Sequence, residues 1–188
     1  MDPVSVLDYR YGTEEMRDVF RANSYLNFLL EVEATLAEAQ AEIGIVPKDA
    51  AVQIRNGIPL VKRERVEEIE SEINHDVMAV VKGLEEQVGE AGKWIHFGAT
   101  SYDIVDTARA LQHKKAINLI EEALSNLIAS IGKLAEEHKD TVMLGRTHGQ
   151  WATPITFGLK MAVFASELAR HMERLIQLKP RILTGKFL

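Results

Sequence analysis

Polar residues that could carry out acid–base chemistry gather in three short segments of this 188-residue sequence. They are Asn74-His75-Asp76, the stretch HFGATSYD at 96–103 and the stretch GRTHGQ at 145–150. Each segment contains a histidine, the side chain whose charge changes most readily near neutral pH. A histidine among anion-binding donors is suited to proton transfer on a carboxylate substrate, so the three segments together predict an active site.

Hydroxyl groups accompany the histidines in two of these segments. Thr100 and Ser101 stand where a long helical pattern begins. Helix starts attract anions because their first N–H groups are unpaired and the helix dipole is positive there. Thr147 and His148 precede the next expected helix, and the glycines around them let a ligand approach the backbone. The pattern therefore favours an anionic ligand that bears carboxylates.

Each segment also has a simpler interpretation, in which it only shapes the backbone. Asp76 is a good N-cap for a following helix, Thr100-x-x-Asp103 is a capping box, and GRTHGQ fits a solvated loop whose glycines permit positive φ. The other histidines lie inside expected helices, where solvent exposure or packing explains them: His113, His138 and His171. A non-catalytic helical interaction module, in which every segment is only a cap, is therefore the alternative from another class.

Composition narrows the possible functions. Without cysteine, without an HExxH motif and with one histidine per segment, the sequence offers no metal-binding pattern. A net charge of −6 argues against general nucleic-acid binding. No run of about 18 apolar residues predicts a membrane span, and the start MDPVSVLDYR lacks the features of a secretion signal. We therefore expect a cytoplasmic protein with no metal, membrane or nucleic-acid partner.

Helical periodicity runs through most of the sequence and strand signals are nearly absent, which predicts an all-α fold. Thr13 is the expected cap of a helix that Gly44 ends, and Thr153 is the expected cap of a helix that begins at Pro154. The helices are expected at 13–43, 47–57, 62–73, 76–88 and 100–139, and from residue 154 onward.

The two longest helices carry apolar residues that the rest of this chain is too short to cover. In the first of them, apolar residues step by four and three as in the seam of a helical bundle: Ile120, Leu124, Leu127, Ile131 and Leu134. The second, from Pro154, is apolar on more than one face. We expect further helices from elsewhere or from partner subunits. The expected domains are an N-terminal helical domain at 1–99 and the beginning of a long-helix bundle at 100–188.

Four stretches of the sequence resemble, in order, the adenylosuccinate lyase family of the fumarase/aspartase superfamily. They are YRYGTEEMRDVF, EIESEINHDVMAVV, WIHFGATSYDIVDTARAL and GRTHGQWATPITFG, and the resemblance runs from Tyr9 to Lys186. Carboxymuconate cycloisomerases of the same superfamily share the TSxDxxDTA form and are the nearest alternative. They tend to lack the histidine of the GRTH segment, so His148 favours the lyase.

The resemblance implies β-elimination of fumarate from adenylosuccinate, which gives AMP. It implies the same reaction on the succinylated aminoimidazole carboxamide ribotide of purine biosynthesis. The substrate is then a small anionic nucleotide, and no metal or organic cofactor takes part. Members of the family are homotetramers around a shared helical bundle, with each active site assembled from several subunits.

The resemblance also implies a role for each candidate residue. His148 matches the general acid that protonates the departing nitrogen, with assistance from His75. Substrate binding is implied for Arg10 and Tyr11 near the phosphate, for Asn74, His75 and Asp76 along the nucleotide, for Thr100, Ser101 and Thr147 at the succinyl carboxylates, and for His96 elsewhere in the pocket.

Family members continue beyond the part that this sequence resembles. Their flexible loop with the pattern GSSxMPxKxNP, whose serine acts as the base, does not occur here. We therefore expect this chain to correspond to the N-terminal part of such an enzyme and to be inactive alone.

Overall fold

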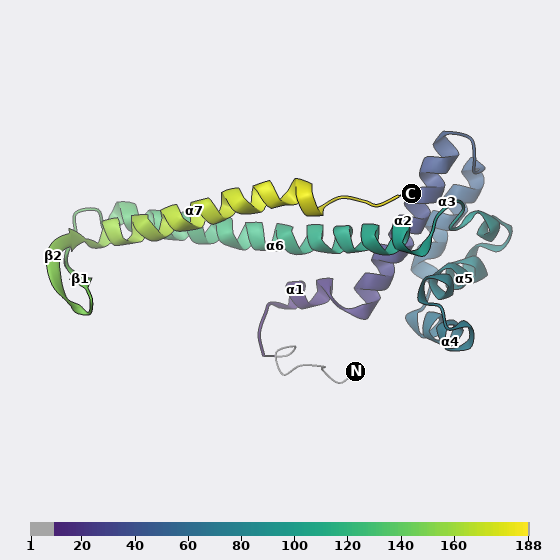
Figure 1. Ribbon diagram of the computed structural model, residues 1–188, viewed down its shortest axis with the longest axis horizontal. Helices are drawn as coiled ribbons and strands as arrows, with labels where there is room; N and C mark the ends of the chain where they lie inside the picture. Colours follow the sequence, from purple (N-terminus) through teal and green to yellow (C-terminus); the bar gives the residue numbers. More distant parts are fainter. Residues whose placement is uncertain (1–9, 188) are drawn as a thin grey trace. The chain divides into compact units, whose positions relative to one another are not determined.

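The structure is a computed structural model that describes residues 10–187, and these are helical nearly throughout (Figure 1). The predicted all-α class is confirmed, with one small β-hairpin added to it. The helices are α1 (Glu14–Val19), α2 (Ala22–Glu42), α3 (Lys48–Gly57), α4 (Arg63–Ile73), α5 (Asp76–Val88), α6 (Ser101–Glu137) and α7 (Phe157–Ile182). Short 3-10 helices cover Ile58–Leu60 and Gly89–Trp94, and the hairpin strands are β1 (Val142–Thr147) and β2 (Gln150–Thr156).

Residues 10–187 divide into two compact units. Unit 1 contains residues 10–115 together with 183–187, and unit 2 contains residues 116–182. The division falls inside α6. The domain boundary expected between residues 99 and 100 stays a prediction.

The core of unit 1 is built by α2, α3 and α5 with the first turns of α6. The largest of its fully buried apolar side chains come one from each of these helices: Leu30, Ile54, Leu84 and Ile104. Burying a side chain of this size contributes about 1.5–3 kcal/mol relative to leaving it exposed. Burial of these apolar faces holds the helices of unit 1 in place, and so fixes the positions of the loops that connect them.

The expected helix at 13–43 is interrupted in the structure. Thr13 caps α1 as predicted, since its hydroxyl accepts from the N–H of Met16 at 3.3 Å. The helix ends at Val19, whose carbonyl accepts from the Gln112 side chain of α6 at 3.0 Å instead of continuing the helical pattern. A second helix, α2, begins at Ala22, and Gly44 follows its end with a φ of 78°, a backbone that suits glycine.

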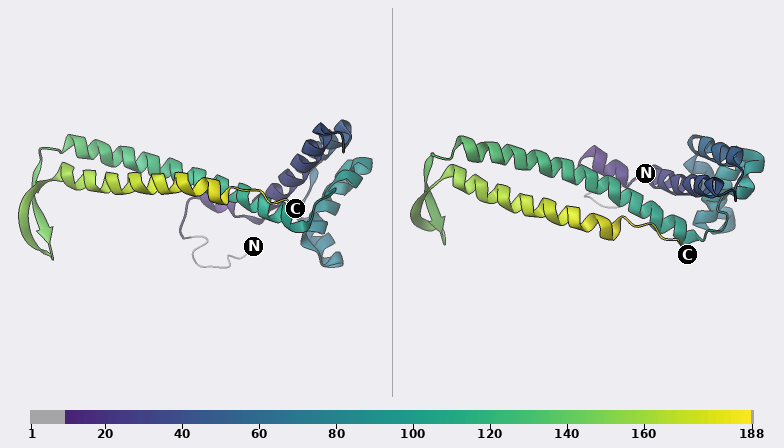
Figure 2. Two further views of the ribbon diagram at one scale, coloured as in Figure 1. Left: turned by 45° about the horizontal axis from the view of Figure 1, so that its top comes forward. Right: turned by 90° about the horizontal axis from the view of Figure 1, so that it is seen from above.

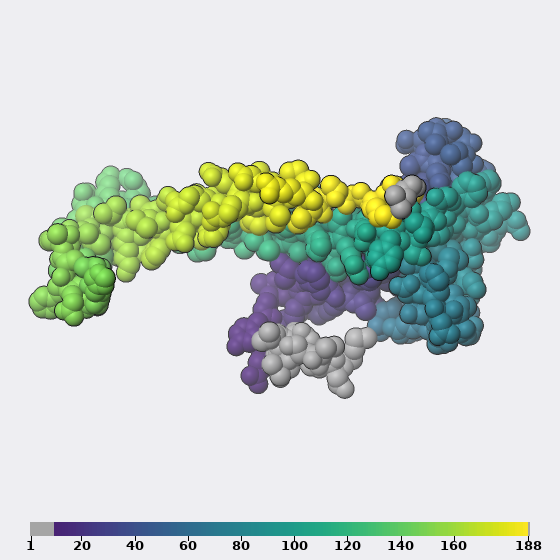
Figure 3. Space-filling model, in the orientation of Figure 1, coloured from purple at the N-terminus to yellow at the C-terminus, as the bar shows by residue number. Residues whose placement is uncertain are grey.

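In unit 2, α7 lies along α6, as Figures 2 and 3 show from several sides. Lys179 of α7 forms an ion pair with Glu121 of α6. Gly158, in the first turn of α7, is buried against the end of α6. A Cβ atom at this position would lie 2.6 Å from the backbone nitrogen and Cα of Lys139 and would also collide with the carbonyl oxygen of Ala135. The helices approach this closely only because residue 158 has no side chain.

Replacing Gly158 by alanine is expected to destabilise unit 2 by about 1–3 kcal/mol, the usual cost of an inserted carbon in a packed contact. Gly132→Ala in α6 is the matched control, because a Cβ there meets nothing within 4 Å. The control should be neutral or stabilise by about 0.5–1 kcal/mol, since glycine weakens a helix interior. Urea unfolding of the two variants measures both effects. Equal stability of the two variants would contradict the close contact at Gly158.

The helix expected from Pro154 begins later, at Phe157, and this prediction was wrong. Thr153 and Pro154 belong to β2, where Pro154 lies opposite Leu144 of β1. Each strand of a two-stranded sheet has a free edge, so proline's missing N–H is tolerated there. The cap of α7 is Thr156, whose hydroxyl accepts from the N–H of Leu159 at 3.0 Å. The segment expected to be a loop before a helix is therefore a hairpin.

Candidate active site

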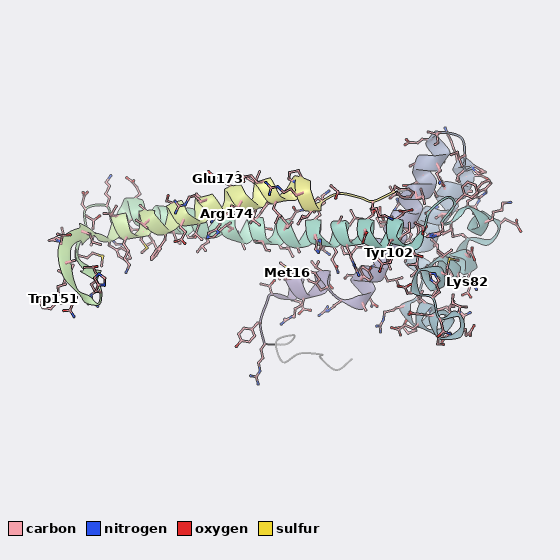
Figure 4. The ribbon with its side chains drawn as sticks, viewed as in Figure 1. Met16, Lys82, Tyr102, Trp151, Glu173 and Arg174 are labelled. Carbon is pink, nitrogen blue, oxygen red and sulfur yellow. The ribbon has the colours of Figure 1, made fainter. Side chains whose placement is uncertain are left out.

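Thr147 and His148 lie at the tip of the hairpin in unit 2. Thr147 ends β1 and lies opposite Gln150, and the turn between them consists of His148 and Gly149 with φ values of 52° and 72°. Two residues with positive φ form the turn that suits the twist of a hairpin. His148 is exposed, and Trp151 beside the turn is 81% exposed and points into solvent (Figure 4). The tip therefore presents an imidazole that is exposed among residues 10–187.

Asn74, His75 and Asp76 form the joint between α4 and α5 in unit 1. Asn74 ends α4 in the left-handed conformation, with a φ of 52°. The N-cap of α5 is His75, and not Asp76 as in the simpler interpretation, because His75 Nδ1 accepts from the N–H of Met78 at 3.3 Å. The imidazole ring presents its acceptor to the helix end, where the unpaired N–H groups lie.

The capping bond determines which ring nitrogen of neutral His75 carries the proton. With Nδ1 acting as an acceptor, the ring proton of neutral His75 lies on Nε2. Asp76 is the first residue of α5, its carboxylate accepts from the N–H of Val77 at 2.8 Å, and its side chain is 75% exposed. The joint therefore combines a proton donor with an accessible carboxylate.

The start of α6 shows one of the two bonds of the predicted capping box. The N–H of Thr100 donates to Asp103 Oδ2 at 3.0 Å, the reciprocal half of a capping box. Asp103 is buried, and its other oxygen accepts from Lys186 Nζ at 3.0 Å. Because Asp103 supplies the capping bond, the hydroxyls of Thr100 and Ser101 are not required for it. Both remain available to bind a ligand beside the first turn of the helix.

His96 precedes the start of α6 along the chain, and its ring has a buried partner that the sequence did not indicate. Its Nδ1 is 2.7 Å from Glu33 Oε1 of α2, and the side chain of Glu33 is inaccessible to solvent. The hydrogen bond that His96 makes to the Glu33 carboxylate raises the pKa of His96, although burial of the ring opposes the rise. Glu33 lies among apolar residues on the buried face of α2. An acidic residue at an apolar position of a helix was the feature of the sequence that could have identified it.

The candidate residues belong to both units. Thr147 and His148 lie in unit 2, and the others lie in unit 1. His96, Thr100 and Ser101 form one continuous segment around the buried Asp103, whereas the hydrogen bonds given above for Asn74, His75 and Asp76 join them to α4 and α5. Arg10 and Tyr11 begin the described part of the chain and are exposed. The roles of all these residues stay predictions.

Two surface hollows formed by described residues are lined by residues other than the candidate ones. A hollow of about 350 Å³ in unit 2 is lined by residues such as Gly132, Lys139 and Leu159. Another of about 250 Å³ lies in unit 1 beside Leu60 and Gln87. Between residues 10 and 187, no three His, Asp or Glu side chains gather as a metal site would require, and no helix there is long and apolar enough to cross a membrane.

Comparisons with known proteins show which family this chain is similar to. The model of the family described as "Lyase" matches residues 8–188. Adenylosuccinate lyase of Pyrococcus abyssi is 51% identical over 185 residues, which are 97% of this chain and 41% of that protein. Adenylosuccinate lyase of Methanocaldococcus jannaschii is 51% identical over 182 residues, which are 95% of this chain and 39% of that protein. The chain thus spans about two fifths of the length of the curated relatives that it matches.

Solved structures share the fold. A fumarate lyase from Mesorhizobium sp. BNC1 superposes with a TM-score of 0.84 at 39% identity and covers 94% of this chain and 43% of its own. The 3-carboxy-cis,cis-muconate lactonizing enzyme of Pseudomonas putida has the same TM-score at 34% identity and covers 97% of this chain and 43% of its own. The resemblance indicated by the sequence motifs is confirmed by these matches.

Proposed function

The chain belongs to the lyase family whose model it matches, and we propose that it provides the N-terminal part of an enzyme that eliminates fumarate from adenylosuccinate to give AMP. The identity of 51% to adenylosuccinate lyases carries this proposal. We propose the same reaction on the succinylated aminoimidazole carboxamide ribotide of purine biosynthesis, in the cytoplasm. The substrate is in both cases a small anionic nucleotide.

The geometry is consistent with different roles for the histidines, which transfer protons, and for the residues at the start of α6, which bind carboxylates. Elimination begins with loss of a proton next to a carboxylate, and negative charge builds on that group. We assign Thr100 and Ser101, with Thr147, to hold the succinyl carboxylates. The leaving nitrogen departs poorly unless it is protonated, and we assign this protonation to His148 with assistance from His75. The accessible imidazole at the hairpin tip and the Nε2 proton of His75 are consistent with both assignments.

The remaining assignments concern the nucleotide. We propose that Arg10 and Tyr11 bind near its phosphate, and that Asn74 and Asp76 lie along the nucleotide. We propose that His96 contributes a further contact in the pocket. All of these groups suit an anionic, hydroxyl-rich ligand.

A homotetramer with shared active sites follows from the same proposal. Apolar residues along α6 and α7 are exposed in unit 2, among them Ile120, Leu127, Leu159, Val163 and Phe164 at 44–58% exposure. Apolar surface in this amount is unusual on a monomer and favours association. We propose that equivalent helices of other subunits cover these faces, and that residues from several subunits complete each site.

The proposal is tested in a full-length lyase that carries this sequence. We expect it to release fumarate from adenylosuccinate and from the ribotide, and light scattering should give a tetramer. The 188 residues alone should show no turnover, since a catalytic set that lacks its base loses most of its rate. Lactone formation from 3-carboxy-cis,cis-muconate without fumarate release would instead identify a cycloisomerase. Absence of both activities in a folded tetramer would favour a non-catalytic helical module.

A further inference from the structure

The carboxylate of Glu33 is buried in unit 1 with one hydrogen bond. Its Oε1 atom pairs with His96 Nδ1 at 2.7 Å, and its Oε2 atom has no hydrogen-bond partner among the described residues. A buried glutamate is rare unless it is paired, because removing its charge from water is costly. The His96 ring is therefore the group that compensates this charge.

The backbone around His96 is held in an unusual conformation. His96 has a φ of 60°, a value that costs a non-glycine residue of order 1–3 kcal/mol. The next carbonyl along the chain, that of Phe97, accepts from Gln40 Nε2 at 2.6 Å. Two polar side chains of the same helix, α2, thus fix consecutive residues just before Thr100. The side chain of Glu33 fixes the ring, and that of Gln40 fixes the backbone.

We propose that Glu33 is a positioning residue, which holds the His96 ring through Nδ1 and so makes Nε2 a cationic donor to an anionic oxygen of the substrate. A carboxylate can only accept, so the hydrogen bond requires that Nδ1 carries a proton. Any proton that His96 gains or loses is then on Nε2. The inference rests on the proposed function in one respect, since it takes the anion to be a phosphate or carboxylate of the lyase substrate.

The charges that face His96 agree with this role. Glu33 of α2 is the main cause of the raised pKa of His96, and Asp103 of α6 adds to it. Asp103 is itself paired with Lys186 Nζ at 3.0 Å, and Thr107 holds the Lys186 backbone, donating to its carbonyl at 3.4 Å and accepting from its N–H at 3.1 Å. Both buried acids shift the ring toward its imidazolium form, and that form alone offers an Nε2–H to an anion when Nδ1 is bonded to Glu33.

The first experiment measures the imidazole itself, in the 188-residue chain. Long-range ¹H–¹⁵N NMR, with the His96 signals identified by their loss in His96→Gln, should show a proton on Nδ1 of the neutral ring. In Glu33→Gln the pKa of His96 should fall. Glu38→Gln is the matched control, because Glu38 lies on the same helix and pairs with Arg55 at 2.6 Å. A neutral ring protonated only on Nε2 would overturn the proposal even if Glu33→Gln fails to fold.

The second experiment measures ligand binding in the full-length lyase. In Glu33→Gln, loss of the charged hydrogen bond between His96 and the substrate should raise KM by about 10- to 100-fold, with a smaller change in kcat. The inhibition constant for AMP rises in Glu33→Gln if the anion is the phosphate, and that for fumarate rises if it is a carboxylate. A lowered His96 pKa with unchanged KM and inhibition constants would exclude substrate contact. Failure of the proposed function would give a different result from failure of the role of Glu33. The unaltered full-length enzyme would lack turnover, while the NMR result on His96 would stand.

Discussion

Replacing His148 by asparagine in a full-length lyase that carries this sequence is expected to lower turnover by about 10²–10⁴, the usual contribution of a general acid or base. Without an acid, the nitrogen leaves as a poorly stabilised anion and the elimination slows. Asparagine is a better test than alanine because residue 148 has a φ of 52°, which asparagine tolerates. His148→Ala should show the same loss, with a small additional loss of stability in the hairpin.

The control for His148 is another exposed histidine without an assigned role. His113 lies on the exposed side of α6 in unit 1, and His113→Gln should keep the turnover of the unaltered enzyme. Steady-state kinetics with circular dichroism of each variant makes the comparison. A folded His148→Asn enzyme with turnover within about tenfold of the original would remove His148 from the role of general acid.

Local signals in the sequence predicted most of the helices. Thr13, Gly44 and the Thr100-x-x-Asp103 pattern all act through atoms within a few residues along the chain, as the structure shows. Such bonds form as soon as the helix forms, so residue types and spacing are enough to locate them. Choosing between adjacent residues was harder. His75 supplies the capping bond of α5 that Asp76 was expected to supply, and either side chain has an acceptor for it.

The hairpin could not be predicted in the same way. Its strands are stabilised by each other, and an isolated hairpin is at best marginally stable in water. Pro154 after Thr153 is also a helix-start signal, which the pairing of Pro154 with Leu144 overrides. The turn contains His148 at positive φ, a position where asparagine or glycine is the usual indication. Pairing of the two strands therefore decided the structure of this segment, which contains the proposed acid.

Glu33 was missed for a related reason. Its partner His96 lies 63 residues away along the chain, and periodicity describes only the helix on which a residue lies. The sequence indicated two separate facts, an acidic residue in the apolar stripe of α2 and a histidine before α6. Only the packing of α2 against the segment before α6 joins them.

Replacing Ser101 by alanine is expected to lower turnover by about 10²–10³, as for removal of one donor to a developing negative charge. Its hydroxyl lies in the first turn of α6, where we propose that charge builds on the succinyl carboxylate. The helix should be unaffected, because Asp103 makes the capping bond to Thr100. Ser101→Thr keeps the hydroxyl and should restore most of the turnover, which a purely structural role for Ser101 does not require.

Arg10→Ala separates binding from chemistry in the same enzyme. A phosphate contact acts about equally on the bound substrate and on the transition state, so its loss raises KM and leaves kcat nearly unchanged. Ser101→Ala should do the reverse, because its donor is most needed when charge has built up. Saturation kinetics on adenylosuccinate measures both parameters. If Arg10→Ala chiefly lowered kcat, or Ser101→Ala chiefly raised KM, the two anionic ends of the substrate would have to be assigned the other way round.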